Sequence, residues 1–188
     1  HNDLGMATAN TMMAAHAGAT HLSVTVNGLG ERAGNAALEE VAAALAANDI
    51  HTGIELRALA ALSQTVARAS GRPLPASKPI TGPLAFAHEA GIHVDALLKQ
   101  ADTYEDERCA PGRFGRERQI VLGKHSGLAG LRAALEAAGL PSGDELLSRL
   151  KPLLRAHATR TKRPLAPEEL ARLATRASRS AMMAGGQS

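Results

Sequence analysis

The first fifty residues alternate between helical and strand-like patterns, and this order constrains the fold more than any other feature of the chain. Residues 4–17 are rich in Ala and Met, contain no Pro and are followed by Gly18, so they predict a helix. Residues 21–26 (HLSVTV) alternate apolar and polar side chains as a strand does, and residues 36–47 return to a helical pattern that Asn48 can end. Helix, strand, loop and helix in this order predict an α/β fold with a parallel sheet or barrel.

A single strand cannot form a sheet, so we expect further strands to precede His1 in the complete protein. The chain also begins with His rather than Met. Both observations predict that it is the C-terminal part of a longer protein.

The chain changes character after residue 71. Residues 55–70 predict a helix closed by Gly71, and the segment GRPLPASKPITGP that follows contains four prolines and two glycines, which mark a domain boundary. Beyond it, we expect a mostly helical part. The predicted divisions are 1–71 (the end of the α/β part), 72–116 (a linker subdomain) and 117–188 (a helical C-terminal subdomain).

Helices and short connections account for most of the second half. We expect a short helix near residues 93–100, a loop to about 116, a strand within RQIVLG (118–123), and helices at 128–138, 143–157 and 167–183. Ser126 and Ser142 are candidate N-caps of the first two of these last three helices, and Pro167 suits a first helical turn.

Composition excludes several classes of protein. The single cysteine, Cys109, rules out an internal disulfide framework and suits a reducing, cytoplasmic compartment. The chain has no apolar run of about 18 residues and no secretory leader, so we expect no membrane span. Aromatic residues make up only 2%, which leaves little to stack on bases and argues against a nucleic-acid partner.

The net charge of +3 is unevenly distributed. A basic cluster near the C-terminus contains Arg155, Arg160, Lys162 and Arg163, with His157 among them. It is either a solvated helix end or an anion site for a carboxylate or a coenzyme phosphate, and the sequence leaves both interpretations open.

The loop NGLGERAGN (residues 27–35) is the strongest candidate site. It follows the predicted strand, and active sites of (β/α) folds lie at the C-terminal ends of strands. Its glycines would let the backbone come close to a ligand, while the bland alternative is a structural turn with a surface Glu/Arg pair. The loop contributes Gly28, Gly30, Glu31, Arg32, Gly34 and Asn35.

Three other stretches offer reactive side chains. His1 heads the segment HND just before a helix and is a candidate metal ligand or merely a terminal residue. In FAHEAGIHVD, His88 and His93 are five residues apart, which does not fit the spacing of a zinc protease. In LGKHSG, the group Lys124, His125 and Ser126 offers a cation, an imidazole and a hydroxyl that could hold an anion.

Five motifs occur in order along nearly the whole chain: HNDLGMATAN, VNGLGERAGNAALEE, FAHEAGIHVDALLK, TYE and LGKHSG. Together they resemble the homocitrate synthase/isopropylmalate synthase family of acyl-CoA condensing enzymes. The resemblance implies a TIM barrel followed by a helical domain, and a reaction that joins acetyl-CoA to a 2-oxo acid.

The resemblance also implies roles for individual residues. The family holds a divalent metal ion (Mg, Mn, Fe or Zn) with an acidic residue, a His-x-His pair and an Asn; His1 matches the second His of that pair and Asn35 matches the Asn. Glu31 and Arg32 would support these ligands. His93 matches the catalytic His and Tyr104 the catalytic Tyr, whereas Ala96 departs from the usual Gly.

In this family the region beyond the barrel crosses to the partner subunit, which implies a homodimer whose sites are completed in trans. The tail ATRTKRPLAPEEL resembles the homocitrate synthase of nitrogen fixation, which implies 2-oxoglutarate as the acceptor. The alternatives are an isopropylmalate or citramalate synthase, or, for the chain in isolation, a non-catalytic dimerisation and binding module.

Overall fold

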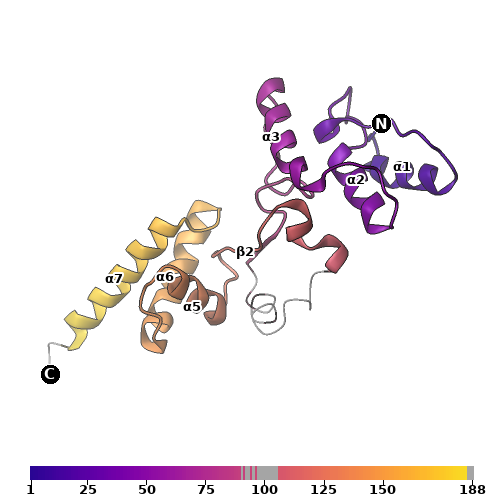
Figure 1. Ribbon diagram of the computed structural model, residues 1–188. Helices are drawn as coiled ribbons and strands as arrows, with labels where there is room; N and C mark the ends of the chain where they lie inside the picture. Colours follow the sequence, from indigo (N-terminus) through magenta and orange to yellow (C-terminus); the bar gives the residue numbers. More distant parts are fainter. Residues whose placement is uncertain (90, 92–93, 95, 97–105, 186–188) are drawn as a thin grey trace. The chain divides into compact units, whose positions relative to one another are not determined.

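The computed structural model describes residues 1–89, 91, 94, 96 and 106–185, with side chains described as far as residue 179 (Figure 1). The chain forms two compact units, and each is treated by itself below. Unit 1 comprises residues 1–86 and 105–118, and unit 2 comprises residues 87–104 and 119–188. The division into 1–71, 72–116 and 117–188 stays a prediction.

Unit 1 is built from three helices joined by short 3-10 turns. The helices are α1 (Ala7–His16), α2 (Leu38–Ala47) and α3 (Leu59–Ser70), and the turns are η1 (Val26–Gly28), η2 (Leu56–Ala58), η4 (Glu107–Cys109) and η5 (Pro111–Phe114). Helices α1 and α2 pack together through a small aliphatic core that includes Met12, Val41 and Leu45. The glycine at position 71 ends α3 in the left-handed conformation, as its sequence position predicts.

The strand predicted for residues 21–26 does not form. Only Thr25 makes a parallel bridge, to Ala37, and the chain then turns through η1. The bridge consists of hydrogen bonds from the Thr25 amide to the Ala36 carbonyl (3.0 Å) and from the Leu38 amide to the Thr25 carbonyl (2.9 Å). The segment lacks its expected hydrogen-bonding neighbours, because the described part of unit 1 contains no strand to pair with it.

A buried ionic network holds the proline-rich segment against α2. Glu39 is only 1% exposed, and its carboxylate lies 2.9 Å from the Lys78 ammonium. The same ammonium lies 2.8 Å from Glu40, which also accepts a hydrogen bond from the Thr8 hydroxyl. The backbone amide of Asn27 donates a hydrogen bond to the Glu39 carboxylate at 3.0 Å. One cation and two carboxylates therefore join α1, α2, the glycine loop and the segment around residue 78.

Further polar contacts fix the end of this segment within unit 1. The buried Thr81 hydroxyl lies 3.1 Å from the Ser63 hydroxyl of α3. The Arg116 guanidinium donates to the carbonyls of Thr81 and Gly82, at 3.1 Å each, and lies over the Phe86 ring. These contacts hold residues 78–86 as part of unit 1, so this stretch is not a free linker.

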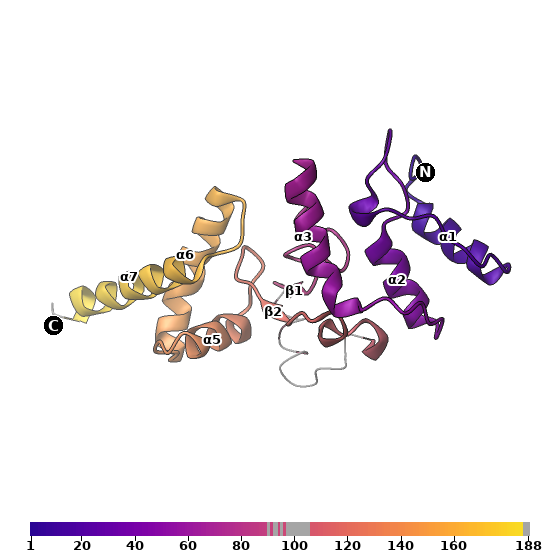
Figure 2. The same ribbon diagram turned by 45° about the horizontal axis from the view of Figure 1, so that its top comes forward.

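Unit 2 combines a minimal parallel sheet with three helices. Strand β1 (Ala87–His88) pairs in parallel with β2 (Gln119–Ile120), and Figure 2 shows the two strands side by side. The helices are α5 (Leu128–Ala137), α6 (Asp144–Thr161) and α7 (Pro167–Gly185). These helices confirm the three predicted for this part, while the predicted strand is two residues long. The helix expected near 93–100 lies mostly outside the described residues.

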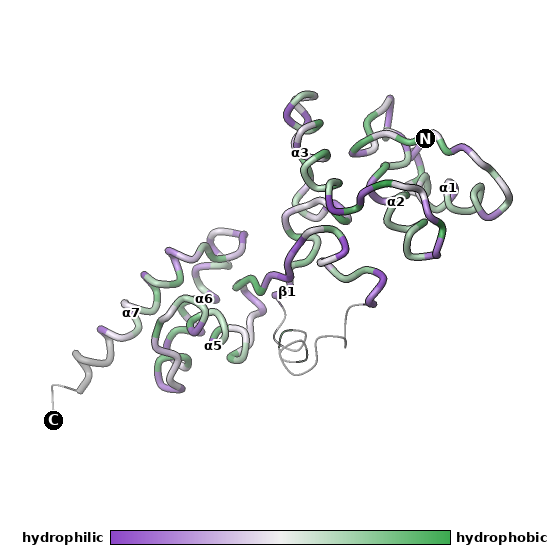
Figure 3. Tube along the Cα trace, in the orientation of Figure 1, coloured by the Kyte–Doolittle hydropathy of each residue, from purple (hydrophilic) through white to green (hydrophobic). Residues whose placement is uncertain are grey.

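An aliphatic core joins the three helices of unit 2. Helices α6 and α7 lie side by side (Figures 1 and 2), and hydrophobic stretches recur along both of them in Figure 3. Leu131, Leu135, Leu147 and Leu150 are fully buried. Among the described residues, this core consists of Leu and Ala, so these helices pack through aliphatic side chains without an aromatic residue.

Both predicted serine caps are wrong. Gly127 and Gly143 precede α5 and α6, and neither helix has a side-chain cap. The Ser142 hydroxyl donates instead to Glu136 (3.0 Å), and the Ser126 hydroxyl accepts a hydrogen bond from the Gly123 amide (2.9 Å). Each serine lies one residue too early to cap its helix, so its hydroxyl serves the preceding turn.

Among the described residues, no helix is both long and apolar enough to cross a membrane.

We predict that Lys78→Met lowers the free energy of unfolding by about 3 kcal/mol, because it leaves the carboxylate of Glu39 buried without its cation. Burial lowers the pKa of Lys78, but the hydrogen bonds and charges of Glu40 and Glu39 outweigh it, so the pKa lies above 10.5. The stabilisation is therefore complete below about pH 10 and is lost as the pH rises further. Urea unfolding at pH 7 and pH 11 measures both effects.

Lys151→Met is the matched control, since Lys151 is exposed on α6. Combining Lys78→Met with Glu39→Gln should recover part of the loss. A Lys78→Met variant as stable as the Lys151→Met variant would contradict the role given to this ion pair.

Candidate functional site

The glycine loop, residues 27–35, folds back across itself. The backbone amide of Asn35 donates to the Gly28 carbonyl at 2.9 Å, and the backbone amide of Gly34 donates to the Glu31 carbonyl at 2.9 Å. The side-chain nitrogen of Asn35 donates to the Leu29 carbonyl, also at 2.9 Å. The start and the end of the loop are therefore bonded to each other through Asn35.

This crossing explains two of the glycines. Gly34 has φ +86°, and a Cβ there would run into the carbonyl oxygen of Gly28. A Cβ on Gly30 would run into the side-chain amide of Asn35. The glycines thus serve the close approach of the loop to itself and to Asn35. A close approach of the backbone to a ligand stays a prediction.

Arg32 ties the loop to the first residues of the chain. Its guanidinium binds the Asp3 carboxylate through two nitrogens, at 2.9 and 3.1 Å, and this hydrogen-bonded contact lowers the pKa of Asp3. The Asn2 amide donates to the Gly34 carbonyl at 2.8 Å, so a second bond joins the same two segments. Glu31 is exposed. Asp3 was not among the predicted site residues, and only its place in the HND motif hinted at it.

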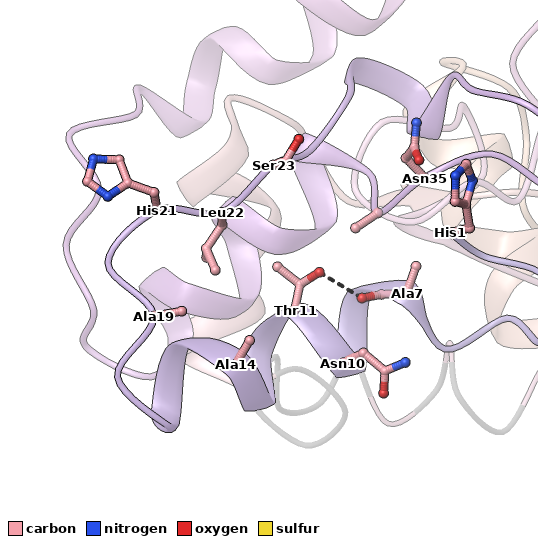
Figure 4. A pocket seen from close by; sticks show the side chains of 11 residues that line it. His1, Ala7, Asn10, Thr11, Ala14, Ala19, His21, Leu22, Ser23 and Asn35 are labelled. Carbon is pink, nitrogen blue, oxygen red and sulfur yellow. Dashed lines mark hydrogen bonds between the residues drawn. The ribbon is translucent and has the colours of Figure 1, made fainter.

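These contacts bring His1 and Asn35 to one pocket of about 340 Å³ (Figure 4). Its other lining residues come from α1 and from the segment before the bridge, and include Asn10, Thr11 and His21. In Figure 4, Asn35 lies beside His1 at one end of the pocket. The side-chain nitrogen of Asn35 is bonded to the Leu29 carbonyl, so the side-chain oxygen is the atom of this residue that can accept a hydrogen bond or bind a metal ion.

Asn35 does not cap the helix that follows it. Ala37 precedes α2, and the helix has no side-chain cap. Asn35 therefore holds the loop rather than the helix.

The donors at this end of the pocket fit a divalent metal ion in part. An imidazole nitrogen from His1 and an amide oxygen from Asn35 are both ordinary ligands of such ions. No group of three His, Cys, Asp or Glu side chains with metal-binding geometry occurs among the described residues. The two residues would thus hold a metal only together with further ligands, which the resemblance assigns to segments upstream of His1.

His93 and Tyr104, the predicted catalytic pair, lie outside the described residues. Their neighbour Glu89 is described, and its carboxylate accepts a hydrogen bond from the His125 amide at 2.9 Å. The loop LGKHSG thus already binds an anion, the chain's own carboxylate. Ser126 is 7% exposed and its hydroxyl is engaged with Gly123, whereas Lys124 and His125 are exposed.

Part of the basic cluster is neutralised by Glu169, a residue that the sequence did not single out. Its carboxylate binds Arg163 at 2.7 Å and lies 3.2 Å from the His157 ring. The hydrogen bond from Arg163, together with one from the Ala166 amide, lowers the pKa of Glu169 to about 2. Arg155 and Arg160 remain exposed.

Comparison with known families assigns both parts of the chain. Residues 1–66 match the HMGL-like family, and residues 80–162 match the homocitrate synthase post-HMGL domain-like family. The first match ends before the proline-rich segment, and the second begins within it.

Several known relatives are similar over most of this chain. It is 52% identical to 2-isopropylmalate synthase 2 of Caldanaerobacter subterraneus subsp. tengcongensis, over 90% of this chain and 44% of the relative. It is 50% identical to (R)-citramalate synthase of Methanocaldococcus jannaschii, over 80% of this chain and 30% of the relative. It is 48% identical to 2-isopropylmalate synthase of Pyrococcus furiosus, over 80% and 31%.

The chain thus spans less than half the length of each of these relatives. Within that span, the order of the two family matches agrees with the order of the predicted domains. Residues 1–66 thus correspond to the end of an HMGL-like TIM-barrel domain, and the helical part that follows corresponds to a post-HMGL domain.

Proposed function

We propose that the protein carrying this chain is an acyltransferase that joins acetyl-CoA to a 2-oxo acid by a Claisen-type condensation. The observation that carries the proposal is the 52% identity to a 2-isopropylmalate synthase over 90% of the chain. The pocket shared by His1 and Asn35 supports it, because both residues belong to the motifs on which the family resemblance rests.

The chemistry of the products defines the acceptor. Isopropylmalate consists formally of an acetyl unit and 2-oxoisovalerate, joined by the new carbon–carbon bond. The corresponding acceptor is pyruvate in citramalate and 2-oxoglutarate in homocitrate. In each reaction the methyl carbon of acetyl-CoA loses a proton and attacks the ketone, and water then releases free CoA from the thioester.

We propose 2-oxoisovalerate as the acceptor, with pyruvate as the second candidate. The tail ATRTKRPLAPEEL pointed to 2-oxoglutarate, but the relatives described above are isopropylmalate and citramalate synthases, whose names favour an acceptor with an uncharged side chain. The word homocitrate enters only through the domain description of residues 80–162.

The proposed roles follow from what each side chain can do. His93 accepts a proton from the methyl carbon of acetyl-CoA, since imidazole exchanges protons near neutral pH. Tyr104 donates a hydrogen bond to the developing oxyanion. His1 and Asn35 help to hold a divalent metal ion, which supplies Lewis-acid polarisation of the acceptor ketone when bound.

An acceptor assay tests the proposed function directly. The full-length protein should release CoA from acetyl-CoA with 2-oxoisovalerate, and its kcat/KM should exceed that for pyruvate and for 2-oxoglutarate by about 100-fold or more, as unlike side chains are rejected. A preference for 2-oxoglutarate would restore the homocitrate assignment. Absence of CoA release with all three acceptors would leave only the non-catalytic binding module.

We predict that Asn35→Ala weakens metal-dependent activity about 10- to 100-fold. The variant loses the side-chain oxygen and the bond to the Leu29 carbonyl. Titration with Mn²⁺, followed by both calorimetry and CoA release, measures the change. Asn10→Ala is the matched control, because Asn10 lines the same pocket but is not a proposed ligand. An unchanged Mn²⁺ affinity in a folded Asn35→Ala variant would remove Asn35 from the site.

We also propose that His93 and Tyr104 act on the partner subunit's barrel. Mixing full-length Asn35→Ala and His93→Ala variants under subunit exchange then places both lesions in one site and leaves the other intact. About half the wild-type activity per mixed dimer should return, because the residues of one site act as a unit. If each site is instead built from one subunit, every site keeps one lesion and mixing restores nothing. Each variant mixed with itself is the control.

A further inference from the structure

Two basic features that lie far apart in the sequence meet in unit 2. A pocket of about 250 Å³ is lined by Lys124 and His125 of the LGKHSG loop and by Lys162 and Arg163 of the C-terminal basic cluster. The sequence had suggested each feature separately as an anion site. Their convergence on one pocket is a property of the fold.

Backbone contacts hold the two features together. The Leu165 amide donates to the Leu122 carbonyl at 2.7 Å, so the chain leaving α6 is bonded to the start of the LGKHSG loop. Lys162 ends α6 in the left-handed conformation, with φ +57°, a position where glycine is the usual residue. The lysine at this position therefore carries its charge at the corner where α6 ends, next to the LGKHSG loop.

The charges of the pocket are positive in balance. Lys124 and Lys162 are exposed, and neither has an acidic partner within the described part of the chain. Arg163 lines the pocket but shares its charge with Glu169. Glu89 places one carboxylate at the edge, bonded to the His125 amide. Two ammonium groups therefore remain for a ligand, and Glu89 opposes its charge.

We propose that this pocket binds a small molecule through a phosphate or diphosphate group. Ammonium groups from two directions, an adjacent guanidinium and the hydroxyl of Thr159 match the many oxygens and the multiple charge of a phosphate better than a single carboxylate. Lysine is a common binder of phosphate as a point charge. The pocket lies wholly within unit 2, so it does not depend on how the two units are placed.

The geometry predicts effects of opposite sign. Lys124→Gln and Lys162→Gln should each weaken the binding of inorganic pyrophosphate about 3- to 10-fold, because each removes one attractive charge. Glu89→Gln should strengthen it about 3-fold, because the repelling charge is lost while the amide oxygen still accepts the bond from His125. A merely structural role of Glu89 would have the opposite result.

Isothermal calorimetry with pyrophosphate at pH 7.5 and low salt measures these affinities, with circular dichroism to confirm that each variant is folded. Lys151→Gln is the matched control, since it removes one exposed charge of α6 that does not line the pocket. The proposal is overturned if Lys124→Gln and Lys162→Gln bind like Lys151→Gln, if Glu89→Gln binds more weakly, or if the wild-type chain shows no binding at about 10 mM pyrophosphate.

Competition identifies the source of the phosphate. Coenzyme A that displaces pyrophosphate from the wild type, and less effectively from Lys162→Gln, assigns the pocket to the phosphates of the proposed coenzyme. Pyrophosphate binding that coenzyme A leaves unchanged assigns the pocket to a separate phosphate-bearing ligand. Pyrophosphate binding is measured without acceptor or metal, so its failure is independent of whether the protein condenses acetyl-CoA.

Discussion

The buried carboxylate of Glu39 is the constraint on which the rest of unit 1 depends. A charged group that is 1% exposed must be paired, and three separate segments supply its partners or share them. The Asn27 amide comes from the start of the glycine loop, Lys78 comes from the proline-rich segment, and α2 carries the carboxylate itself. Satisfying one side chain therefore fixes the position of the candidate site relative to the segment that leads out of the barrel domain.

The same constraint shows where sequence reasoning succeeds and fails. The helices of residues 128–138 and 167–183 were predictable because their Leu and Ala residues recur with helical spacing and meet a common core. The strand of residues 21–26 was not, because a strand forms only beside another strand, and local alternation cannot reveal whether that neighbour is present. The Lys78 pair was likewise out of reach, since 38 residues separate it from Glu40 and charge spacing carries no signal over that distance.

The glycine loop of the candidate site was predictable only in part. The motif NGLGERAGN predicted the loop, and the resemblance predicted Asn35 within it and His1 as metal ligands, a role that stays a prediction. The sequence could not show that Gly30 and Gly34 are needed by the loop's own crossing, because that crossing depends on contacts between residues three to seven apart. It also could not separate the proposed acceptors, which differ only in the side chain of the 2-oxo acid.

In unit 2, acidic residues neutralise part of the positive charge and leave the rest at one pocket. Glu169 pairs with Arg163 and lies close to His157, and Glu89 accepts a hydrogen bond from the backbone amide of His125. Lys124 and Lys162 line the same pocket without an acidic partner among the described residues. The left-handed residue that ends α6 is a lysine rather than the more usual glycine, and the chain beyond it is bonded to the LGKHSG loop, so Lys162 and Lys124 line one pocket. This concentration of positive charge at one pocket supports the proposal that an anionic ligand binds there.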